Sequence, residues 1–440
     1  MLDVLRELIL DAQEMPLDTG IPRHLDVRTV PGKATVCIGV RRSGKSTFML
    51  QLMSRLLDDG VPRENILHLN FFDDRLHALR HSDLGVITEA YFSLYPEKKN
   101  TETIYCFFDE VQVLPHWEPF VDRLMRTEQS EVYITGSSAQ MLSREVATQM
   151  RGRALSWEIF PFSFEEFMEF HDVDHSEPLS TRKRLAVQKA FEHFWEAGGF
   201  PEVAGLDRRL RTMIHQEYLN TVLFRDLVER HDISHPQAVA DLTHRLIDNV
   251  ASLQTANSLT GYLKSLGHKI SRNRITEYLA WLEDAFFIYQ VRLFDASLSR
   301  SNVNPKKIYC VDHALAASAG SGILVNTGHL LENLIFSALR RITAEIFYYR
   351  TGNGKEVDFV AQVPERKRML IQVCESMVDQ GTRSREVAAI SEAMTELGLA
   401  EGTIVTRNEN DQLAVTNGVV NVVPAWRFLL SLSSEAEKTS

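Results

Sequence analysis

One run of eight residues has the composition and spacing of a phosphate-binding loop. Gly39-Val-Arg-Arg-Ser-Gly44-Lys45-Ser46 fits the pattern GxxxxGK[ST] between a β-rich run and a helical run. Glycines let backbone N–H groups close around phosphate oxygens, the lysine reaches the β- and γ-phosphates, and the hydroxyl ligates Mg²⁺. The helix that follows adds the positive end of its dipole. The sequence therefore predicts a nucleoside triphosphate site with Mg²⁺, formed by Gly39, Arg42, Ser43, Gly44, Lys45, Ser46 and Thr47.

A second apolar run, residues 104–108, ends in two acidic residues, Asp109 and Glu110. Asp109, at a strand end, suits binding Mg²⁺ either directly, together with Ser46, or through a water ligand of the ion, and Glu110 suits orienting or deprotonating the attacking water. Open α/β sheets bind ligands at this edge of their strands. Glu110 and Lys45 are therefore candidate catalytic residues. A further strand end carries Ser137, whose hydroxyl suits sensing the γ-phosphate or the attacking water, although the same composition is ordinary in turns.

Short β-rich runs must position these residues. They cover residues 34–38, 66–71, 103–108, 131–134 and 154–159. Between them, stretches such as 47–57 and 117–128 place apolar residues at helical spacing. This alternation predicts an α/β class fold with a parallel sheet covered by helices. We assign it to residues 1–165, with 1–30 as a helical lead-in.

The rest of the chain shows three further patterns. Residues 166–235 form a succession of helical patterns, which predicts a helical lid. Residues 236–304 contain a helix, a Gly267 turn, a second helix and a β-like run, an order that suggests a winged helix. Residues 305–440 contain the order αβββαβ, which fits a small α/β domain of its own.

Composition limits the classes of protein that remain. The 440 residues include 48 Lys+Arg and 59 Asp+Glu, so the formal net charge is −11. With 44% hydrophobic and 24% charged residues, the chain is neither disordered nor collagen-like. The acidic balance argues against a protein coated in basic charge, although a local basic patch is compatible with it. No apolar run is long enough to span a bilayer, and four scattered cysteines predict reduced, buried thiols in a cytoplasmic protein.

Several motifs together resemble the AAA+/STAND-related P-loop ATPases of the archaeal-ATPase type. They lie at residues 39–46, 108–112, 134–138, 151–153, 161–167 and 198–202, and the resemblance extends from residue 20 to 430. It implies ATP hydrolysis at the phosphate loop, followed by a winged helix and a restriction-endonuclease-like domain. It also implies that Pro201, in the turn Gly199-Phe-Pro201, contacts the nucleotide, although a plain helix-ending turn explains the same residues.

Arg153, in the pair Gly152-Arg153, is the candidate for sensing the γ-phosphate or acting as an arginine finger. An ordinary surface ion pair is the alternative. Arg41 and Arg42, inside the phosphate loop, compete for the same role.

The C-terminal segment resembles the PD-(D/E)XK nuclease fold but lacks part of its site. Glu332, on the first helix, and Asp358, on the second strand, match metal-binding carboxylates. Such nucleases also need a lysine that assists the attacking water. The strand that should read Glu-x-Lys has Gln372 and Cys374 instead, and nothing requires Lys355 to replace the lysine. We therefore expect a degenerate site of Glu332, Asp358 and Gln372, with the fold kept as a nucleic-acid grip or an oligomer contact.

Basic residues gather where a recognition helix would begin. Lys269, Arg272 and Arg274 surround the Gly267 turn, and Lys306 with Lys307 adds positive charge further on. Such a cluster suits phosphate contacts with DNA, but it is also typical of a solvated helix face.

Together these features predict a Mg²⁺-dependent ATPase that forms homo-oligomers and remodels DNA, branched or forked. The alternative is an ATP-dependent switch that controls protein assembly without a DNA substrate. An ATP-gated nuclease is a third reading, which the missing Glu-x-Lys disfavours.

Overall fold

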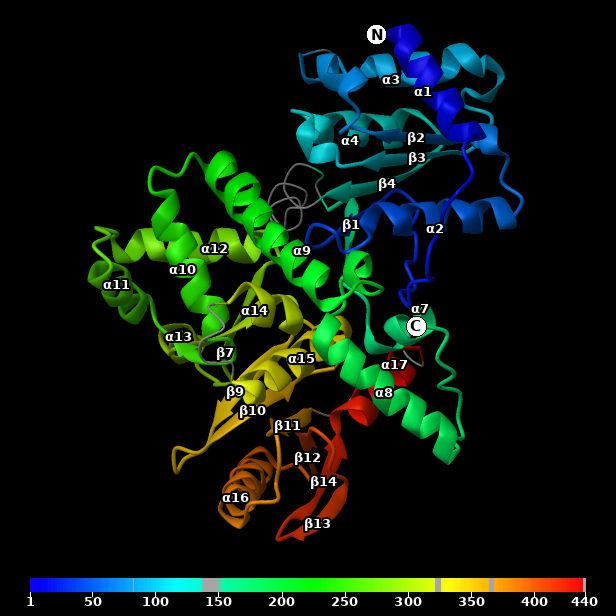
Figure 1. The fold of residues 1–440 in the computed structure, drawn as a ribbon. Coiled ribbons are helices and arrows are strands. Elements are labelled where there is room, and N and C mark those ends of the chain that lie inside the picture. The colour runs from blue at the N-terminus through cyan, green and yellow to red at the C-terminus, as the bar shows by residue number, and fades with distance from the viewer. Residues whose placement is uncertain (82, 137–149, 151, 321–325, 364–367, 438–440) are drawn as a thin grey trace. The chain divides into compact units, whose positions relative to one another are not determined.

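The computed structural model describes residues 1–81, 83–136, 150, 152–320, 326–363 and 368–437 (Figure 1). The chain divides into two compact units, Met1–Phe160 and Pro161–Ser440. Within the described residues, no helix is long and apolar enough to cross a membrane. All four cysteines are free and buried, as the sequence predicts.

The first unit contains a five-stranded sheet. Its strands are β1 (Ala34–Ile38), β2 (Ile66–Asn70), β3 (Ile104–Asp109), β4 (Ser130–Gly136) and β5 (Ala154–Glu158). The order is β2-β3-β4-β1-β5, and every neighbouring pair is parallel. The predicted parallel sheet is therefore confirmed. Because all strands run the same way, the ends of β1, β3 and β4 meet at one edge.

Helices cover this sheet. They are α1 (Leu2–Glu14), α2 (Lys45–Asp58), α3 (Gly85–Leu94) and α4 (Trp117–Thr127), joined by short 3-10 turns at Arg63–Asn65, Asp74–His81, Pro96–Lys98 and Val111–Val113. The apolar side of α2 packs Phe48, Met49 and Leu52 on Cys37 and Phe107 of the sheet. This contact holds the start of α2 against the end of β1, where the phosphate loop lies.

The second unit begins with helices, as the pattern predicts. They are α7 (Phe164–Phe170), α8 (Thr181–Ala197), α9 (Arg208–Thr221), a π-helical stretch η6 (Val222–Glu229) and α10 (Pro236–Asp248). Helix α7 starts at a capping box, in which the Ser163 hydroxyl accepts from the Glu166 amide and the Glu166 carboxylate accepts from the Ser163 amide.

A nine-stranded mixed sheet spans the remainder of this unit. Its order is β13-β14-β12-β11-β10-β9-β7-β8-β6. The strands are β6 (Leu253–Gln254), β7 (Ile288–Leu293), β8 (Lys306–Cys310), β9 (Ile346–Arg350), β10 (Glu356–Ala361), β11 (Met369–Val373), β12 (Glu401–Thr406), β13 (Asp411–Val415) and β14 (Gly418–Pro424). The helices are α11 (Ala256–Ser265), α12 (Arg272–Asp284), α13 (Leu298–Val303), α14 (His313–Ala319), α15 (Thr327–Ile342), α16 (Gln380–Leu397) and α17 (Ala425–Glu437).

The predicted element orders are present in this sheet. Helices α11 and α12 precede β7, and α15, β9, β10, β11, α16 and β12 follow in the order αβββαβ. Strand β7 pairs in parallel with β9, so these two segments share one sheet (Figure 1). The winged-helix and nuclease-like assignments themselves stay predictions. Strand β8 and the hairpin β13–β14 were not predicted.

Candidate functional site

The phosphate loop follows β1 and depends on two glycines. Gly39 has φ 140°, and a Cβ there would lie 2.3 Å from the Ile159 carbonyl oxygen. Gly44, with φ 94° in the left-handed region, caps the start of α2. Side chains at these positions would clash or strain the backbone, so only glycine permits this path. Ser46 and Thr47 consequently lie in the first turn of α2, where backbone N–H groups lack intrahelical partners.

Two polar side chains of the loop are buried. The Lys45 ammonium donates to the Gly39 and Val40 carbonyl oxygens at 3.1 and 2.9 Å. Ser43 is fully buried, and its hydroxyl has no hydrogen-bond partner among the described residues. An orphaned buried hydroxyl costs free energy unless a ligand satisfies it. The loop therefore fits an anionic ligand that supplies acceptors.

Arg23, which the sequence reasoning missed, braces the loop from the lead-in. Its guanidinium donates to the Ser43 carbonyl oxygen at 2.8 Å and also to the Phe160 carbonyl oxygen. Its backbone amide donates to Gln51 of α2 at 3.1 Å, and Arg23 is buried. These contacts join the lead-in, the loop and the end of the sheet. No phosphate-loop motif includes an upstream arginine, so no sequence signal indicated it.

The two predicted acids lie at the end of β3, one strand removed from β1. Asp109 is buried and accepts a hydrogen bond from the Thr135 hydroxyl of β4, the strand between them. The Glu110 amide donates to the same hydroxyl at 2.9 Å. Thr135 thus orients both acids, a role that the sequence did not reveal.

Glu110 has an unusual backbone. Its φ of 55° and ψ of 41° place a non-glycine residue in the left-handed region. Such conformations cost of order 1–3 kcal/mol and gather at functional sites. The Glu110 carboxylate accepts a hydrogen bond from the Gln112 amide. The backbone turn and Gln112 together hold this carboxylate at the edge where β1 and β3 end.

The oxygens at this edge suit Mg²⁺ with a triphosphate. Mg²⁺ is usually bound by one or two protein oxygens plus phosphate oxygens and water, and a hydroxyl at Ser46 and a carboxylate at Asp109 meet that need. A dedicated all-protein metal site is a different matter: among the described residues, no group of three or more His, Cys, Asp or Glu side chains could hold a metal ion.

The remaining predicted nucleotide residues lie elsewhere. Arg153 immediately precedes β5 and pairs with Asp122 at 3.1 Å. Because Ala34 pairs with Ala154, Arg153 lies beside the start of β1, at the opposite edge of the sheet from the phosphate loop. Within one chain it therefore does not approach the loop. Ser137 falls outside the described residues.

Pro201 belongs to the second unit, where it opens a short 3-10 turn, Pro201–Val203. The preceding glycine is held tightly: a Cβ at Gly199 would lie 2.4 Å from the Phe162 carbonyl oxygen, and its amide donates to Asp312 at 2.8 Å. The glycine in this motif thus has a packing reason inside the unit.

The basic residues predicted for DNA are exposed. Lys269, Arg272 and Arg274 all lie on the surface around the start of α12. Arg274 also pairs with Glu277 at 2.6 Å. The adjacent His268 is bonded to Asp241 at 2.6 Å.

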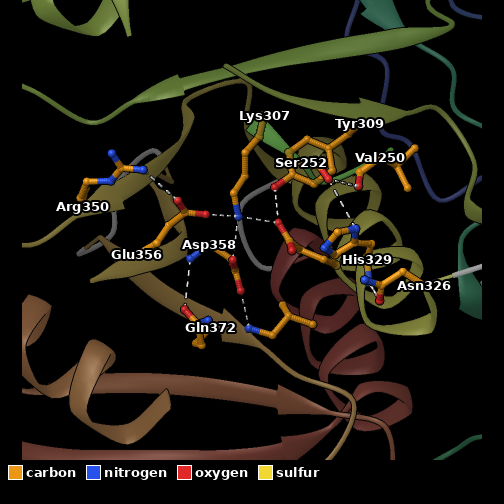
Figure 2. A network of polar contacts seen from close by, with 12 residues as sticks. Val250, Ser252, Lys307, Tyr309, Asn326, His329, Arg350, Glu356, Asp358 and Gln372 are labelled. Atoms are coloured by element: carbon orange, nitrogen blue, oxygen red, sulfur yellow. Dashed lines mark hydrogen bonds and ion pairs between the residues drawn. The ribbon is translucent and has the colours of Figure 1, made fainter. Parts of the chain in front are cut away.

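The predicted degenerate site is brought together in the second unit, around a residue that sequence reasoning misplaced. Lys307, expected as surface charge, is buried, and its ammonium lies 2.9 Å from Glu332, 2.9 Å from Glu356 and 2.8 Å from Asp358. Figure 2 shows the ammonium of Lys307 with Glu356 and Asp358 directed toward it. The surface reading of Lys307 is therefore wrong. Lys355 instead pairs with Glu392.

Gln372 borders this acidic cluster (Glu332, Glu356, Asp358 and Lys307) without adding charge. Its carbonyl oxygen accepts from the Asp358 amide at 3.2 Å, and its NH₂ donates to Glu386 at 2.8 Å. Asp358 lies where the β9–β10 register shifts, which turns its carboxylate to accept from the Val373 amide at 2.9 Å.

Burial and charge set the protonation of the cluster. Burial raises the pKa of Glu332 to about 8, and the Asp358 charge adds to the effect while Lys307 opposes it. Burial alone would lower the pKa of Lys307, but the surrounding carboxylates outweigh it and hold that pKa well above its ordinary value. The lysine therefore stays charged, and Glu332 is the carboxyl group that retains a proton.

Comparison with known families agrees with the first unit. Residues 31–168 match the family model described as AAA domain. This match, the parallel sheet and the phosphate loop define the class of this region: residues 31–168 form an AAA-type P-loop domain. Residues 188–325 and 327–428 match two models described only as domains of unknown function, DUF8612 and DUF4143.

Two relatives match this chain over most of its sequence. The chain is 32% identical over 436 residues to the uncharacterized protein MJ1544 of Methanocaldococcus jannaschii, covering 97% of this chain and 95% of the relative. It therefore belongs to the same protein family as that archaeal protein. An uncharacterized protein of Haemophilus influenzae is 30% identical over 74% of this chain and 79% of its own length.

Solved structures are more distant. A Walker-type ATPase of Pyrococcus abyssi matches with TM-score 0.39 at 16% identity, covering 65% of this chain and 90% of that one. The Aeropyrum pernix Orc1 protein, solved in complex with DNA, matches with TM-score 0.28 at 14% identity, covering 73% and 91%. Likenesses this weak carry no functional inference.

Proposed function

We propose that this chain is a Mg²⁺-dependent ATPase that couples ATP hydrolysis to binding and remodelling DNA, branched or forked. The observation that carries the ATPase part is the common sheet edge, where the phosphate loop of β1 lies across β4 from Asp109 and Glu110. A cation, hydroxyl groups and two oriented carboxylates at one edge are the groups that phosphoryl transfer requires.

Each residue in this proposal has one role. Lys45 leaves its carbonyl partners and donates to the β- and γ-phosphate oxygens. The remaining oxygens are bound by the backbone N–H groups around Gly39, Arg42, Ser43, Gly44 and Thr47.

Ser46 and Asp109 would hold Mg²⁺, which neutralises charge that develops on the phosphates. Glu110 orients the attacking water and takes its proton, and Thr135 and Gln112 keep Glu110 in position.

Arg153 has a narrower role in this proposal. Its place at the opposite sheet edge supports an arginine finger only toward the phosphate loop of a neighbouring subunit in a homo-oligomer. A structural ion pair with Asp122 is the alternative. We also propose that Ser137 and Pro201 contact the nucleotide, and this part of the proposal rests on the sequence alone.

The DNA part rests on the exposed cations around α12. Lys269 and Arg272 lie on the surface beside a helix start, where they suit phosphate contacts of a winged helix. In the nuclease-like segment, the neutral Gln372 supports a grip without cleavage. The proposal therefore includes no nuclease activity.

The test measures ATP turnover of the wild type and Glu110→Gln, with and without forked, duplex and single-stranded DNA, at two salt concentrations. We expect forked DNA to raise wild-type turnover, and Glu110→Gln to lower turnover at least about 100-fold. Glu89→Gln, an exposed glutamate on α3, is the matched control and should behave as wild type.

A second pair of variants separates the DNA part. Lys269→Ala with Arg272→Ala should weaken DNA binding and reduce its salt dependence, because two phosphate contacts are lost. Arg184→Ala with Lys189→Ala, the same charge change on the exposed face of α8, should not. Turnover that ignores every DNA, with nucleotide-dependent oligomer size, would replace the DNA part by a switch that controls protein assembly.

A further inference from the structure

We infer that Lys307 is a built-in cation that fills the centre of the acidic cluster in place of a metal ion and fastens β8 to α15 and β10. This inference does not depend on the ATPase proposal. It concerns the second unit alone and assigns a function to a lysine that no sequence motif indicated.

The ammonium of Lys307 lies at the centre of the acidic cluster. Lys307 is only 3% exposed, and its Nζ lies within 2.9 Å of oxygens from three carboxylates. These carboxylates come from α15 and β10, whereas the lysine comes from β8. A divalent ion needs its oxygen ligands at about 2.0–2.6 Å, so it would take the point that Nζ occupies only after the three carboxylates moved inward; as they stand around the ammonium, they do not form a metal-binding group. A metal ion at this point would almost coincide with the ammonium. Two cations so close together in a buried site repel strongly, so the ammonium excludes the metal.

Strand β8 holds Lys307 in place through further contacts with α15. Residues two apart on a strand face the same side, so Tyr309 points with Lys307 toward α15. Its hydroxyl donates to Glu332 at 2.6 Å. One residue further, Asn333 of α15 exchanges two hydrogen bonds with the Cys310 backbone, at 2.7 and 3.0 Å. Three consecutive contacts therefore fix β8 against α15, and the lysine is the one that also reaches β10.

The charges within the acidic cluster largely balance one another. Gln372, next to Asp358, contributes no charge, and the Glu386 carboxylate beyond it is already paired with Arg385 at 2.7 Å. Arg350 pairs with Glu356 at 3.4 Å at the more exposed side of the cluster. Two cations, Lys307 and Arg350, then face the three carboxylates, so most of the negative charge of the cluster is balanced without a metal.

The contacts of Lys307 join two segments of the chain that match separate family models. Lys307 belongs to the segment that matches one family model, and Glu332 and Asp358 belong to the segment that matches the next. The built-in cation joins them into one unit across the shared sheet. Removal of the ammonium would leave uncompensated buried carboxylates and vacate a position that a divalent cation can take.

The experiment follows thermal unfolding of the nucleotide-free full-length chain in EDTA and in millimolar Mn²⁺. We expect Mn²⁺ to leave the wild-type Tm unchanged. Lys307→Met should lower Tm by roughly 5–10 °C in EDTA, and Mn²⁺ should restore most of the loss. Adding Asp358→Asn to Lys307→Met should abolish this rescue.

Lys98→Met is the matched control. Lys98 is also a buried lysine, but it lies in the first unit and contacts one carboxylate, Glu102, together with Asn65. Its replacement should lower Tm without any rescue by Mn²⁺.

Two outcomes overturn the inference. The first is a wild-type Tm that rises with Mn²⁺ and no longer does so in Asp358→Asn, because the cluster then binds a metal alongside Lys307. The second is a Lys307→Met protein that keeps its Tm or gains nothing from Mn²⁺. If Lys307→Met does not fold, the inference is tested instead by measuring Mn²⁺ binding to the wild type and to Asp358→Asn by electron paramagnetic resonance. Equal binding by wild type and Asp358→Asn supports the inference, and weaker binding by Asp358→Asn overturns it.

Discussion

Two buried lysines, Lys45 in the phosphate loop and Lys307 in the acidic cluster, have opposite surroundings. Lys45 donates to carbonyl oxygens of its own loop, and the loop also contains a buried hydroxyl, that of Ser43, with no partner in the described part of the chain. Lys307 is enclosed by carboxylates from two other elements. Carbonyl oxygens are neutral and can be exchanged for phosphate oxygens, whereas carboxylates already balance the charge. The partners, rather than the lysine, distinguish a site prepared for a ligand from a site that is closed.

The glycines at the two places differ in a related way. Gly39 and Gly44 allow the loop to curve around an anion, whereas Gly199 is packed against the backbone at Phe162. The first unit uses backbone freedom to form a ligand site, and the second uses the missing side chain to bring chain segments together.

The largest effect that sharpens this comparison is expected for Lys45→Met. Turnover of ATP should fall at least about 100-fold, because the loss of a donor to a phosphoryl group in its transition state has that magnitude. Thermal stability should change less than in Lys307→Met, since the Gly39 and Val40 carbonyl oxygens that accept from Lys45 are neutral groups of its own loop. Steady-state turnover and Tm on the same samples measure both effects. Lys33→Met, at the other sheet edge, is the control. Turnover within threefold of the wild type would contradict the role given to Lys45.

A smaller effect, on stability, is expected for Gly199→Ala. The new Cβ would lie 2.4 Å from the Phe162 carbonyl oxygen, a backbone atom that cannot move aside easily. We expect a loss of about 2–4 kcal/mol in the free energy of unfolding, measured by denaturant titration. Gly205→Ala is the control, because its Cβ would meet only the Phe170 ring at 3.5 Å. Equal stability of both variants would show that the Gly199 turn is not a packing requirement.

The smallest effect, when it is expressed per pH unit, concerns the pH dependence of the acidic cluster. The pKa of Glu332 is raised from 4.5 to about 8 in the folded chain, mainly by burial. The folded state therefore holds a proton that the unfolded state releases, so this group's stabilisation is complete below pH 4.5 and is lost as pH rises toward 8. Glu332→Gln, which has no proton to lose, should remove up to about 1.4 kcal/mol per pH unit of this slope. Unfolding titrations from pH 5 to pH 8 measure the difference. Parallel slopes for wild type and variant would contradict the protonation assigned to Glu332.

Local signals predicted the first unit well. The strand 34–38 coincides with β1, and the other four β-rich runs fall on β2 to β5 within a few residues. The phosphate loop and the two acids were found because each needs only a short, contiguous pattern. Local spacing also predicted the second helix after the Gly267 turn, which is α12 (Arg272–Asp284).

Residues that act across the chain escaped prediction. Arg23 reaches Ser43 from twenty positions upstream, and Thr135 orients Asp109 from the neighbouring strand. Lys307 lies beside Lys306, a pairing typical of a solvated surface, and β8 itself was not predicted. None of these roles has a local pattern, because each depends on which strands become neighbours.

The sequence by itself determined the class of the first unit, the phosphate loop and the likeness of the C-terminal element order to a nuclease fold, since these follow from periodicity and short-range spacing. Only the tertiary structure decided that Arg153 lies at the opposite sheet edge and that Lys307 is enclosed by Glu332 and Asp358. The physical reason is that burial and long-range pairing set the partners of a charge. Those partners decide whether a lysine binds a ligand, meets solvent or replaces a metal.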